Sequence, residues 1–268
     1  MPFESYSDID KNEPVSPRAD GEYVTSSKAF GKILLYMGIG LLFTALVAVG
    51  VSAAFAGWLT NWTYDYAVFQ NLGEAINANR TPFIVYFGAV IVSFIGILVT
   101  GVAMAVTVAK GKRSPWPPFI IYSTFMGILM SIFLVAGIDF LTIGEAFGIS
   151  AAAFVIMGII GFFSKRNLNF LVMVLLTGVI MLAIAGLVMG LLYWRNPGAY
   201  TVWSFVYTGA VLVLLLVMVA ADTYNIKKIV SQGNATKNMC VYCAYVMYTH
   251  FINIFIRVLI LLARIKRN

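Results

Sequence analysis

The amino-acid sequence predicts an all-α integral membrane protein in which seven transmembrane helices form one bundle. Hydrophobic residues make up 61% of the 268 residues and charged residues only 11%, a balance far from that of soluble domains. The chain contains seven apolar segments, each near or above the roughly 20 residues that a helix needs to cross about 30 Å of hydrocarbon. Lipid offers no partners for backbone polar groups, so runs of this length without alternating polarity indicate helices and not barrel strands.

The first stretch, residues 1–32, is predicted to be a flexible cytoplasmic tail. It is polar and holds six of the eleven acidic residues, a composition typical of solvated chain. Residues 33–268 are predicted to form the seven-helix transmembrane domain. Its spans are expected at Ile33–Ala56, Phe83–Ala109, Pro118–Ile138, Ile143–Phe163, Leu168–Tyr193, Tyr200–Ala221 and Met239–Ala263.

The distribution of Lys and Arg predicts the orientation of the bundle. With the tail inside, the inner segments hold twelve of these residues, and the outer loops among the first six spans hold two. Such an excess is typical of the cytoplasmic side, so the N-terminus is expected inside. The last segment departs from this rule, because a full crossing leaves Arg264, Lys266 and Arg267 outside. A full crossing is preferred, and a re-entrant hairpin that returns these charges inside is the alternative.

The last apolar segment carries polar residues that are unusual in a membrane helix. His250, Asn253 and Arg257 lie within about 60° of one another at 3.6 residues per turn. Ionisable groups at membrane depth are costly and usually face a bundle interior or water. This helix is therefore expected to lie at the centre of the bundle, among other helices.

Three short motifs resemble those of a known family. Met247–Phe255, with the sequence Met-Tyr-Thr-His-Phe-Ile-Asn-Ile-Phe, resembles the Leu-Tyr-Leu-Asp-Phe-Ile-Asn-Leu-Phe pattern of the Bax inhibitor family. Ala221–Ile226 is similar to the Tyr-Asp-Thr-Gln element of that family, and Ser164–Leu168 is similar to its Thr-Lys-Arg-Asp-Leu loop. The motifs occur in the family's order over roughly residues 30–265. The chain thus resembles a bacterial-type member of the Bax inhibitor-1 family.

The resemblance implies a compact bundle in which six helices surround a central C-terminal helix, with two facing acids on the last two helices. Family members are described as pH-sensitive calcium leak channels. Relatives also restrain cell death or modulate a membrane-bound protease. The resemblance therefore implies either a pH-sensitive calcium leak or a non-conducting regulator that binds other membrane proteins.

The first acid of the family's pair corresponds to Asp222, whereas His250 stands at the second position. An Asp beside a His favours the charged form of both, and desolvation opposes this. The hypothesis is that His250 takes up a proton near physiological pH, pairs with Asp222 and holds the last two helices together. The alternative is structural, with Asp222 exposed at a helix end and His250 hydrogen-bonded in the interior. Calcium binding is strengthened by carboxylate charge. Because His250 replaces the second acid, any calcium site at Asp222 is expected to be weak.

Five further polar residues are candidates for supporting roles. Tyr248, Asn253 and Arg257 are expected to complete the polar face of the last helix, although Arg257 could instead extend outward along its apolar stem. Asp139 and Glu145 flank the short connection between the third and fourth spans. We expect these two acids to be exposed at the surface, and a cation funnel at the outer mouth is the alternative.

No motif in the chain predicts an enzyme or a resident cofactor. Cys240 and Cys243 form a C-x-x-C pair, but a zinc site needs a second pair of ligands. The formal charge of +7 lies mostly between the apolar runs, so nucleic acid is not expected as a partner. The expected partners are the lipid bilayer, calcium or protons, and other membrane proteins. The expected location is a bacterial plasma membrane, with the endoplasmic reticulum or another internal membrane as the alternative.

Overall fold

The computed structural model describes residues 26–60, 80–110, 114–164, 197–231 and 236–267, together with 73, 178, 180–182 and 184–186. No strand occurs among these residues, and six helices are long and apolar enough to cross a membrane. The helices are α1 (Ser26–Leu59), α3 (Arg80–Lys110), α4 (Trp116–Val135), α5 (Phe140–Phe163), α7 (Pro197–Ser231) and α8 (Lys237–Arg267). The prediction of an all-helical, multi-pass membrane protein is confirmed.

The helices extend beyond the predicted spans at most ends. α1 begins at Ser26, so its first turns include residues that the sequence assigned to the tail. α7 continues to Ser231, about ten residues past the predicted end of that span. Apolarity marks the part of a helix that lies in hydrocarbon, and it carries no information on how far the helix continues into water or headgroups.

The predicted fifth span, Leu168–Tyr193, lies mostly outside the described residues, and its described residues between 178 and 186 are helical. The neighbouring helices constrain the path of the chain here. Lys227, near the end of α7, bonds the carbonyl of Phe162, near the end of α5. The two helices therefore end on the same side of the bundle.

The local sequence explains the turn between α4 and α5. α4 begins at Trp116 with proline in its first turn, where the missing N–H costs no hydrogen bond. After α4 ends, Gly137 adopts a φ of 74°, a left-handed conformation that favours glycine. The side chain of Asp139 then accepts a hydrogen bond from the backbone of Thr142 and starts α5. A short turn, shaped by Gly137 and Asp139, thus joins α4 and α5.

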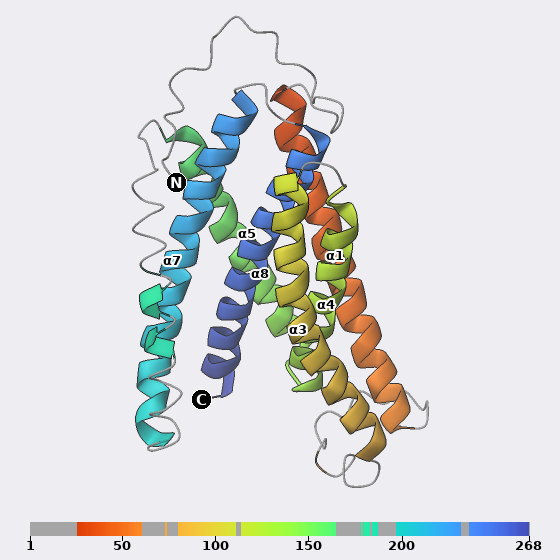
Figure 1. The fold of residues 1–268 in the computed structure, drawn as a ribbon. Helices are drawn as coiled ribbons and strands as arrows, with labels where there is room; N and C mark the ends of the chain where they lie inside the picture. Colours follow the sequence, from red (N-terminus) through yellow and green to blue (C-terminus); the bar gives the residue numbers. More distant parts are fainter. Residues whose placement is uncertain are drawn as a thin grey trace, which may run out of the picture.

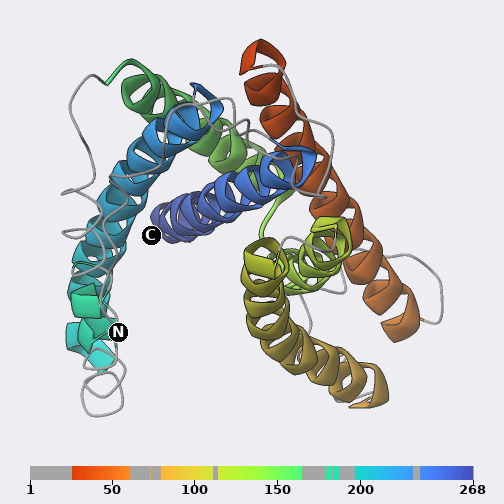
Figure 2. The same cartoon turned by 45° about the horizontal axis from the view of Figure 1, so that its top comes forward.

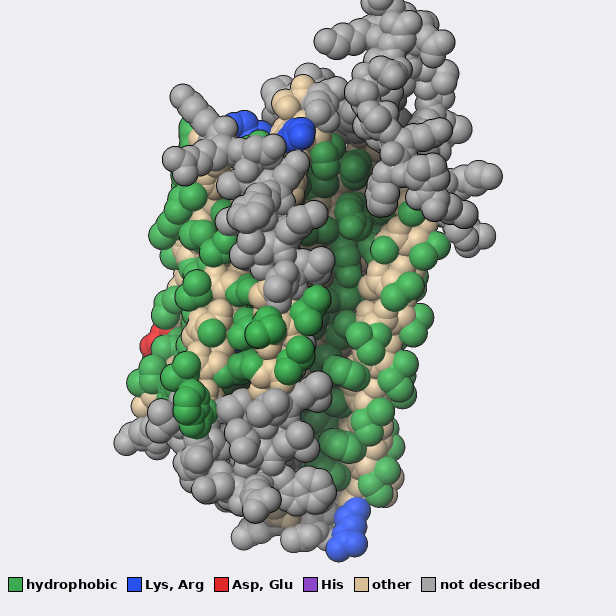
Figure 3. All heavy atoms as spheres, turned by 60° about the vertical axis from the view of Figure 1, so that its left-hand side comes forward, with side chains coloured by type: hydrophobic (Ala, Val, Ile, Leu, Met, Phe, Trp, Pro, Cys, Tyr) green, Lys and Arg blue, Asp and Glu red, His purple; other side chains and the backbone are tan. Residues whose placement is uncertain are grey.

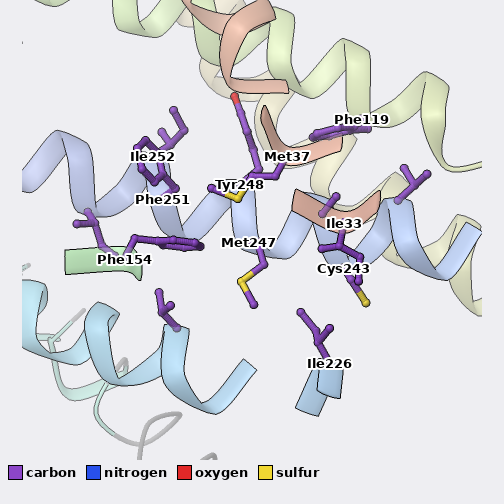
Figure 4. Packing of buried hydrophobic residues seen from close by; sticks show 14 of the residues in the cluster. Ile33, Met37, Phe119, Phe154, Ile226, Cys243, Met247, Tyr248, Phe251 and Ile252 are labelled. Carbon is purple, nitrogen blue, oxygen red and sulfur yellow. The ribbon is translucent and has the colours of Figure 1, made fainter. Parts of the chain in front are cut away.

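The last helix, α8, contacts each of the other five described helices. Figures 1 and 2 show it between α5 and α7 on one side and α1, α3 and α4 on the other. Buried side chains of neighbouring helices gather around it in Figure 4, among them Met37, Phe119, Phe154 and Ile226. α8 is one uninterrupted helix from Lys237 to Arg267. The alternative of a re-entrant hairpin is therefore wrong.

The two ends of the bundle are named here by their landmarks. At the α7–α8 end, α7 ends at Ser231 and α8 begins at Lys237. At the C-terminal end, α8 ends at Arg267 and α5 begins at Phe140. Figure 3 shows hydrophobic side chains covering the length of the helices on one face, while Lys and Arg lie at the two ends. This distribution matches a bilayer, whose hydrocarbon contacts the apolar belt.

Candidate functional site

The antiparallel arrangement of α7 and α8 brings Asp222 and His250 into contact. Asp222 lies nine residues before the end of α7 at Ser231, and His250 lies thirteen residues after the start of α8 at Lys237. The Nε2 atom of His250 is 2.6 Å from the Oδ2 atom of Asp222. An ionised carboxylate only accepts hydrogen bonds, so with Asp222 ionised the Nε2 atom is the donor. The contact that the sequence left open is present.

The pair lies in a largely enclosed part of the bundle. The side chain of His250 is 11% exposed and that of Asp222 is 29% exposed. Tyr242 and Cys243, also on α8, lie within electrostatic range of Asp222. Partial burial strengthens the attraction between opposite charges, because fewer water molecules screen it. A neutral imidazole makes a hydrogen bond here, and a protonated one makes an ion pair on the same two atoms.

Close packing of α5 against α7 determines where Asp222 lies. A Cβ atom at Gly161 would lie 2.2 Å from the carbonyl oxygen of Ala220, so the two backbones touch two residues before Asp222. The Nζ atom of Lys227 donates to the carbonyl oxygen of Phe162 over 2.7 Å and also lies over the Phe162 ring. These contacts hold α7 at a defined depth and rotation relative to α5.

The three residues expected to complete the polar face of α8 have separate environments. The hydroxyl of Tyr248 is 2.5 Å from the Oγ1 atom of Thr44, so this buried ring faces α1, away from Asp222. Asn253 is exposed and donates to the carbonyl of Thr249 in its own helix. The guanidinium of Arg257 lies 5.9 Å from the centre of the Tyr207 ring on α7. None of the three bonds the Asp222–His250 pair.

The two acids near the α4–α5 turn are exposed, as expected. Glu145 pairs with Lys266 over 2.8 Å, and Lys266 also donates to the Thr142 hydroxyl over 3.0 Å. Asp139 accepts hydrogen bonds from the backbone N–H of Thr142 over 2.9 Å and from its hydroxyl over 2.6 Å. These contacts join the end of α8 to the start of α5. A role of the two acids as a cation funnel stays a prediction.

Asp139 provides a stability prediction with a defined pH dependence. Its bond to the Thr142 side chain, followed by the bond to the Thr142 backbone, lowers the pKa of Asp139 from its ordinary value of 3.8. A carboxyl whose pKa is lower in the folded state stabilises the protein above the unfolded pKa. This contribution is lost as the pH falls through the lower, folded pKa. Asp139→Asn keeps a capping oxygen and removes the charge.

At neutral pH the wild type should therefore have a higher unfolding temperature than Asp139→Asn. We expect the difference to disappear between about pH 5 and pH 2, measured by thermal unfolding in detergent. A difference that stays constant over this range would contradict the assignment of the effect to the ionised carboxyl.

Several residues in these contacts were not predicted from the sequence. Thr44, Gly161 and Lys227 each lie within or beside an apolar run, where a single small or polar residue is common. Their partners are distant in sequence; Thr44, for example, meets Tyr248. The available signal was weak: Lys227 lies in the last turns of a helix, where a cation can bind free carbonyls.

The donor atoms around the Asp222–His250 pair do not suit a resident metal ion. Calcium normally takes six to eight oxygen ligands, whereas Asp222 faces an imidazole nitrogen. No group of three or more His, Cys, Asp or Glu side chains suited to a metal occurs in the described part of the chain. Cys240 and Cys243 are buried, free thiols. The residues near Asp222 therefore do not fit a resident calcium site.

Comparison with known proteins places these features in a family. A family model described as inhibitor of apoptosis-promoting Bax1 matches residues 27–268. The chain belongs to the Bax inhibitor-1 family. The match covers all six described spans and includes the Asp222–His250 pair. The resemblance seen in the three sequence motifs is confirmed.

Several uncharacterized bacterial proteins are similar to this chain over nearly its whole length. An uncharacterized membrane protein of Streptococcus pyogenes serotype M1 is 28% identical over 240 residues, covering 88% of this chain and 92% of that protein. A second, from S. pyogenes serotype M6, is similar to the same extent. The uncharacterized protein YrjE of Lactococcus lactis is 26% identical over 256 residues, covering 92% of this chain and 93% of its own length. This Bax inhibitor-1 family member is thus a multi-pass membrane protein with bacterial relatives.

Proposed function

We infer that the protein is a pH-sensitive cation leak of a bacterial plasma membrane, gated by Asp222 and His250, with calcium as the candidate permeant ion. The observation that carries this proposal is the 2.6 Å contact between Nε2 of His250 and Oδ2 of Asp222, which joins α7 to α8 inside the bundle. A titratable bridge between two spans can change its strength with pH and thereby change how the spans pack. In the proposed arrangement six helices surround α8, and the α7–α8 end of the bundle faces the cytoplasm.

The proposed gate responds to pH in a definite direction. Protonation of His250 converts the hydrogen bond into an ion pair, and charge-assisted hydrogen bonds are roughly twice as strong as neutral ones. The stronger bridge holds α7 against α8 and closes the path. Loss of the proton at higher pH weakens the bridge, so the leak rises with pH. This direction follows from an Asp–His pair and does not require the two carboxylates of the family pattern.

Calcium-dye flux in liposomes tests the proposal. We expect the purified wild type to leak at a rate that rises between about pH 5 and pH 8. This range brackets the usual pKa of histidine in model peptides, about 6.5. Asp222→Ala should abolish the pH dependence, because His250 loses its partner. Tyr248→Phe is the matched control, since its hydroxyl bonds Thr44 on the opposite side of α8; its pH profile should equal that of the wild type.

The outcomes separate the leak from the alternative function. A pH profile that survives Asp222→Ala would contradict the proposed gate. Silence of the wild type together with flux through His250→Asp would show that this chain lost conduction at its second acid position. Silence of all variants would contradict conduction altogether. Either form of silence favours a non-conducting regulator that binds other membrane proteins.

A further inference from the structure

Two arginines of α8 reach the same turn of α7. The Nη1 atom of Arg264 donates to the hydroxyl of Ser204 over 2.5 Å, and its Cζ atom lies 5.5 Å from the centre of the Phe205 ring. The Cζ atom of Arg257 lies 5.9 Å from the centre of the Tyr207 ring. Arg257 and Arg264 are about 10 Å apart along α8, whereas the three residues they contact lie within one helical turn. Both guanidinium groups therefore contact residues of the same turn of α7.

The carboxylates that the structure describes are already engaged. After Glu74 the sequence contains only three acidic residues. Asp139 caps α5, Glu145 pairs with Lys266, and Asp222 contacts His250. Within the described ranges, no ion pair joins a carboxylate to either Arg257 or Arg264. Arg257 and Arg264 are half-buried. Half-buried cations that contact one helical turn repel each other and are normally compensated by an anion. The charge balance at this turn predicts a bound anion.

The surroundings of the two arginines indicate which anion fits. On the same turn of α7, Trp203 is 60% exposed and Val206 is 58% exposed, so apolar surface available to acyl chains adjoins the guanidinium groups. Arginine binds phosphate oxygens through two parallel N–H donors. Arg264 lies one turn from the end of α8, at a level that suits a lipid headgroup. A free phosphate would leave the apolar surface unused.

We propose that Arg257 and Arg264, with Ser204, bind the phosphate of an anionic phospholipid where α7 and α8 meet at the C-terminal end of the bundle. The lipid neutralises both guanidinium groups and joins the two helices at a point far from the Asp222–His250 contact. Its binding stabilises the α7–α8 interface and requires no ion conduction. The site is therefore independent of the proposed leak.

Lipid titration of the full-length protein in detergent tests the proposal. The probes are dioleoyl-phosphatidylglycerol, dioleoyl-phosphatidylcholine and inorganic phosphate, and the readouts are native mass spectrometry and the unfolding temperature. We expect phosphatidylglycerol to bind and stabilise the wild type more than phosphatidylcholine does. Arg257→Gln with Arg264→Gln should weaken phosphatidylglycerol binding by at least about tenfold, because two charge-assisted contacts are lost.

Matched variants distinguish a site from general charge attraction. Lys28→Gln with Lys32→Gln removes the same charge from the start of α1 and should leave binding unchanged. Arg257→Lys with Arg264→Lys keeps both charges and should retain part of the affinity, which shows that the interface still folds. Equal binding of the two lipids by the wild type, or full binding by the double glutamine variant, would overturn the proposal.

Two further outcomes would also overturn it. Stabilisation by inorganic phosphate alone, equal to that by phosphatidylglycerol, would show that the site takes a free anion. The acids Asp65 and Glu74 lie outside the described residues, and we expect Asp65→Asn with Glu74→Gln to leave lipid binding unchanged. A marked increase in binding would show that these carboxylates, and not a lipid, neutralise the arginines in the wild type.

Discussion

Gly161→Val is expected to prevent α5 from packing against α7 and to cause the largest loss of stability of any single change considered for this protein. A Cβ atom at this position would lie 2.2 Å from the carbonyl oxygen of Ala220 and 2.8 Å from its carbonyl carbon. The obstacle is backbone, so no side-chain rotation relieves the clash. Overpacking typically costs about 1–3 kcal/mol and occasionally more, and we expect a value at or above the top of this range.

Thermal unfolding in detergent, read together with the gel-filtration profile, measures this effect. Gly144→Val is the matched control, because the same β-branched residue is introduced in α5 at a glycine with no neighbouring atom within 4 Å. Gly158→Ala tests the interface itself, since the new Cβ would meet only the Thr223 hydroxyl at 3.9 Å. An unfolding temperature of Gly161→Val equal to that of Gly144→Val would refute the close approach of the two backbones.

His250→Asp is expected to make stability strongly dependent on pH. The substitution places a second carboxyl beside Asp222, where the imidazole now lies 2.6 Å away. Two unit charges about 4 Å apart interact by about 4 kcal/mol at an effective dielectric constant of 20. The folded variant avoids this cost by keeping one proton on the pair of carboxyl groups. In the unfolded chain the pKa of each Asp is near 3.9, so both carboxyl groups lose their protons at neutral pH. Folding of the variant therefore takes up a proton.

The sign of the effect follows from this proton uptake. Stability falls as the pH rises above about 4, by up to about 1.4 kcal/mol for each pH unit, until the folded pair also loses its proton. Unfolding temperatures of His250→Asp should thus decrease steadily between about pH 5 and pH 7. The double variant Asp222→Asn with His250→Asp carries a single carboxyl and should show a weaker dependence. Equal slopes for the two variants would mean that the carboxyl groups do not interact.

The polar face of α8 illustrates where reasoning from helical periodicity was sufficient and where it was not. The hypothesis was that His250 pairs with Asp222 of the preceding span, and the two side chains are in contact. Arg257 shares the side of α8 that carries His250 and faces α7 through Tyr207. Asn253 was assigned to the same face, but it is exposed. A difference of about 60° around a helix is enough to separate a residue from its neighbour's partner.

Tyr248 shows the limit of reasoning from a motif. It stands two residues from His250 in a motif of the family, and two residues correspond to about 200° around a helix. Its hydroxyl accordingly meets Thr44 of α1. The assignment of Tyr248 to the polar face with His250 was therefore wrong, and the spacing of two residues gives the reason. The partner Thr44 could not be named, because a threonine within an apolar run commonly bonds only its own helix, as Thr44 also does with the Gly40 carbonyl.

Hydrophobic length was sufficient to establish that the chain crosses a membrane and where six described spans lie, because a segment in hydrocarbon must bond its own backbone and so becomes a helix. The assignment of partners required the tertiary structure. Spans that are apolar on every side do not specify which face turns inward or how far one helix is shifted along another. Packing makes that choice, through the approach of Gly161 to Ala220. This approach determines which group Asp222 meets.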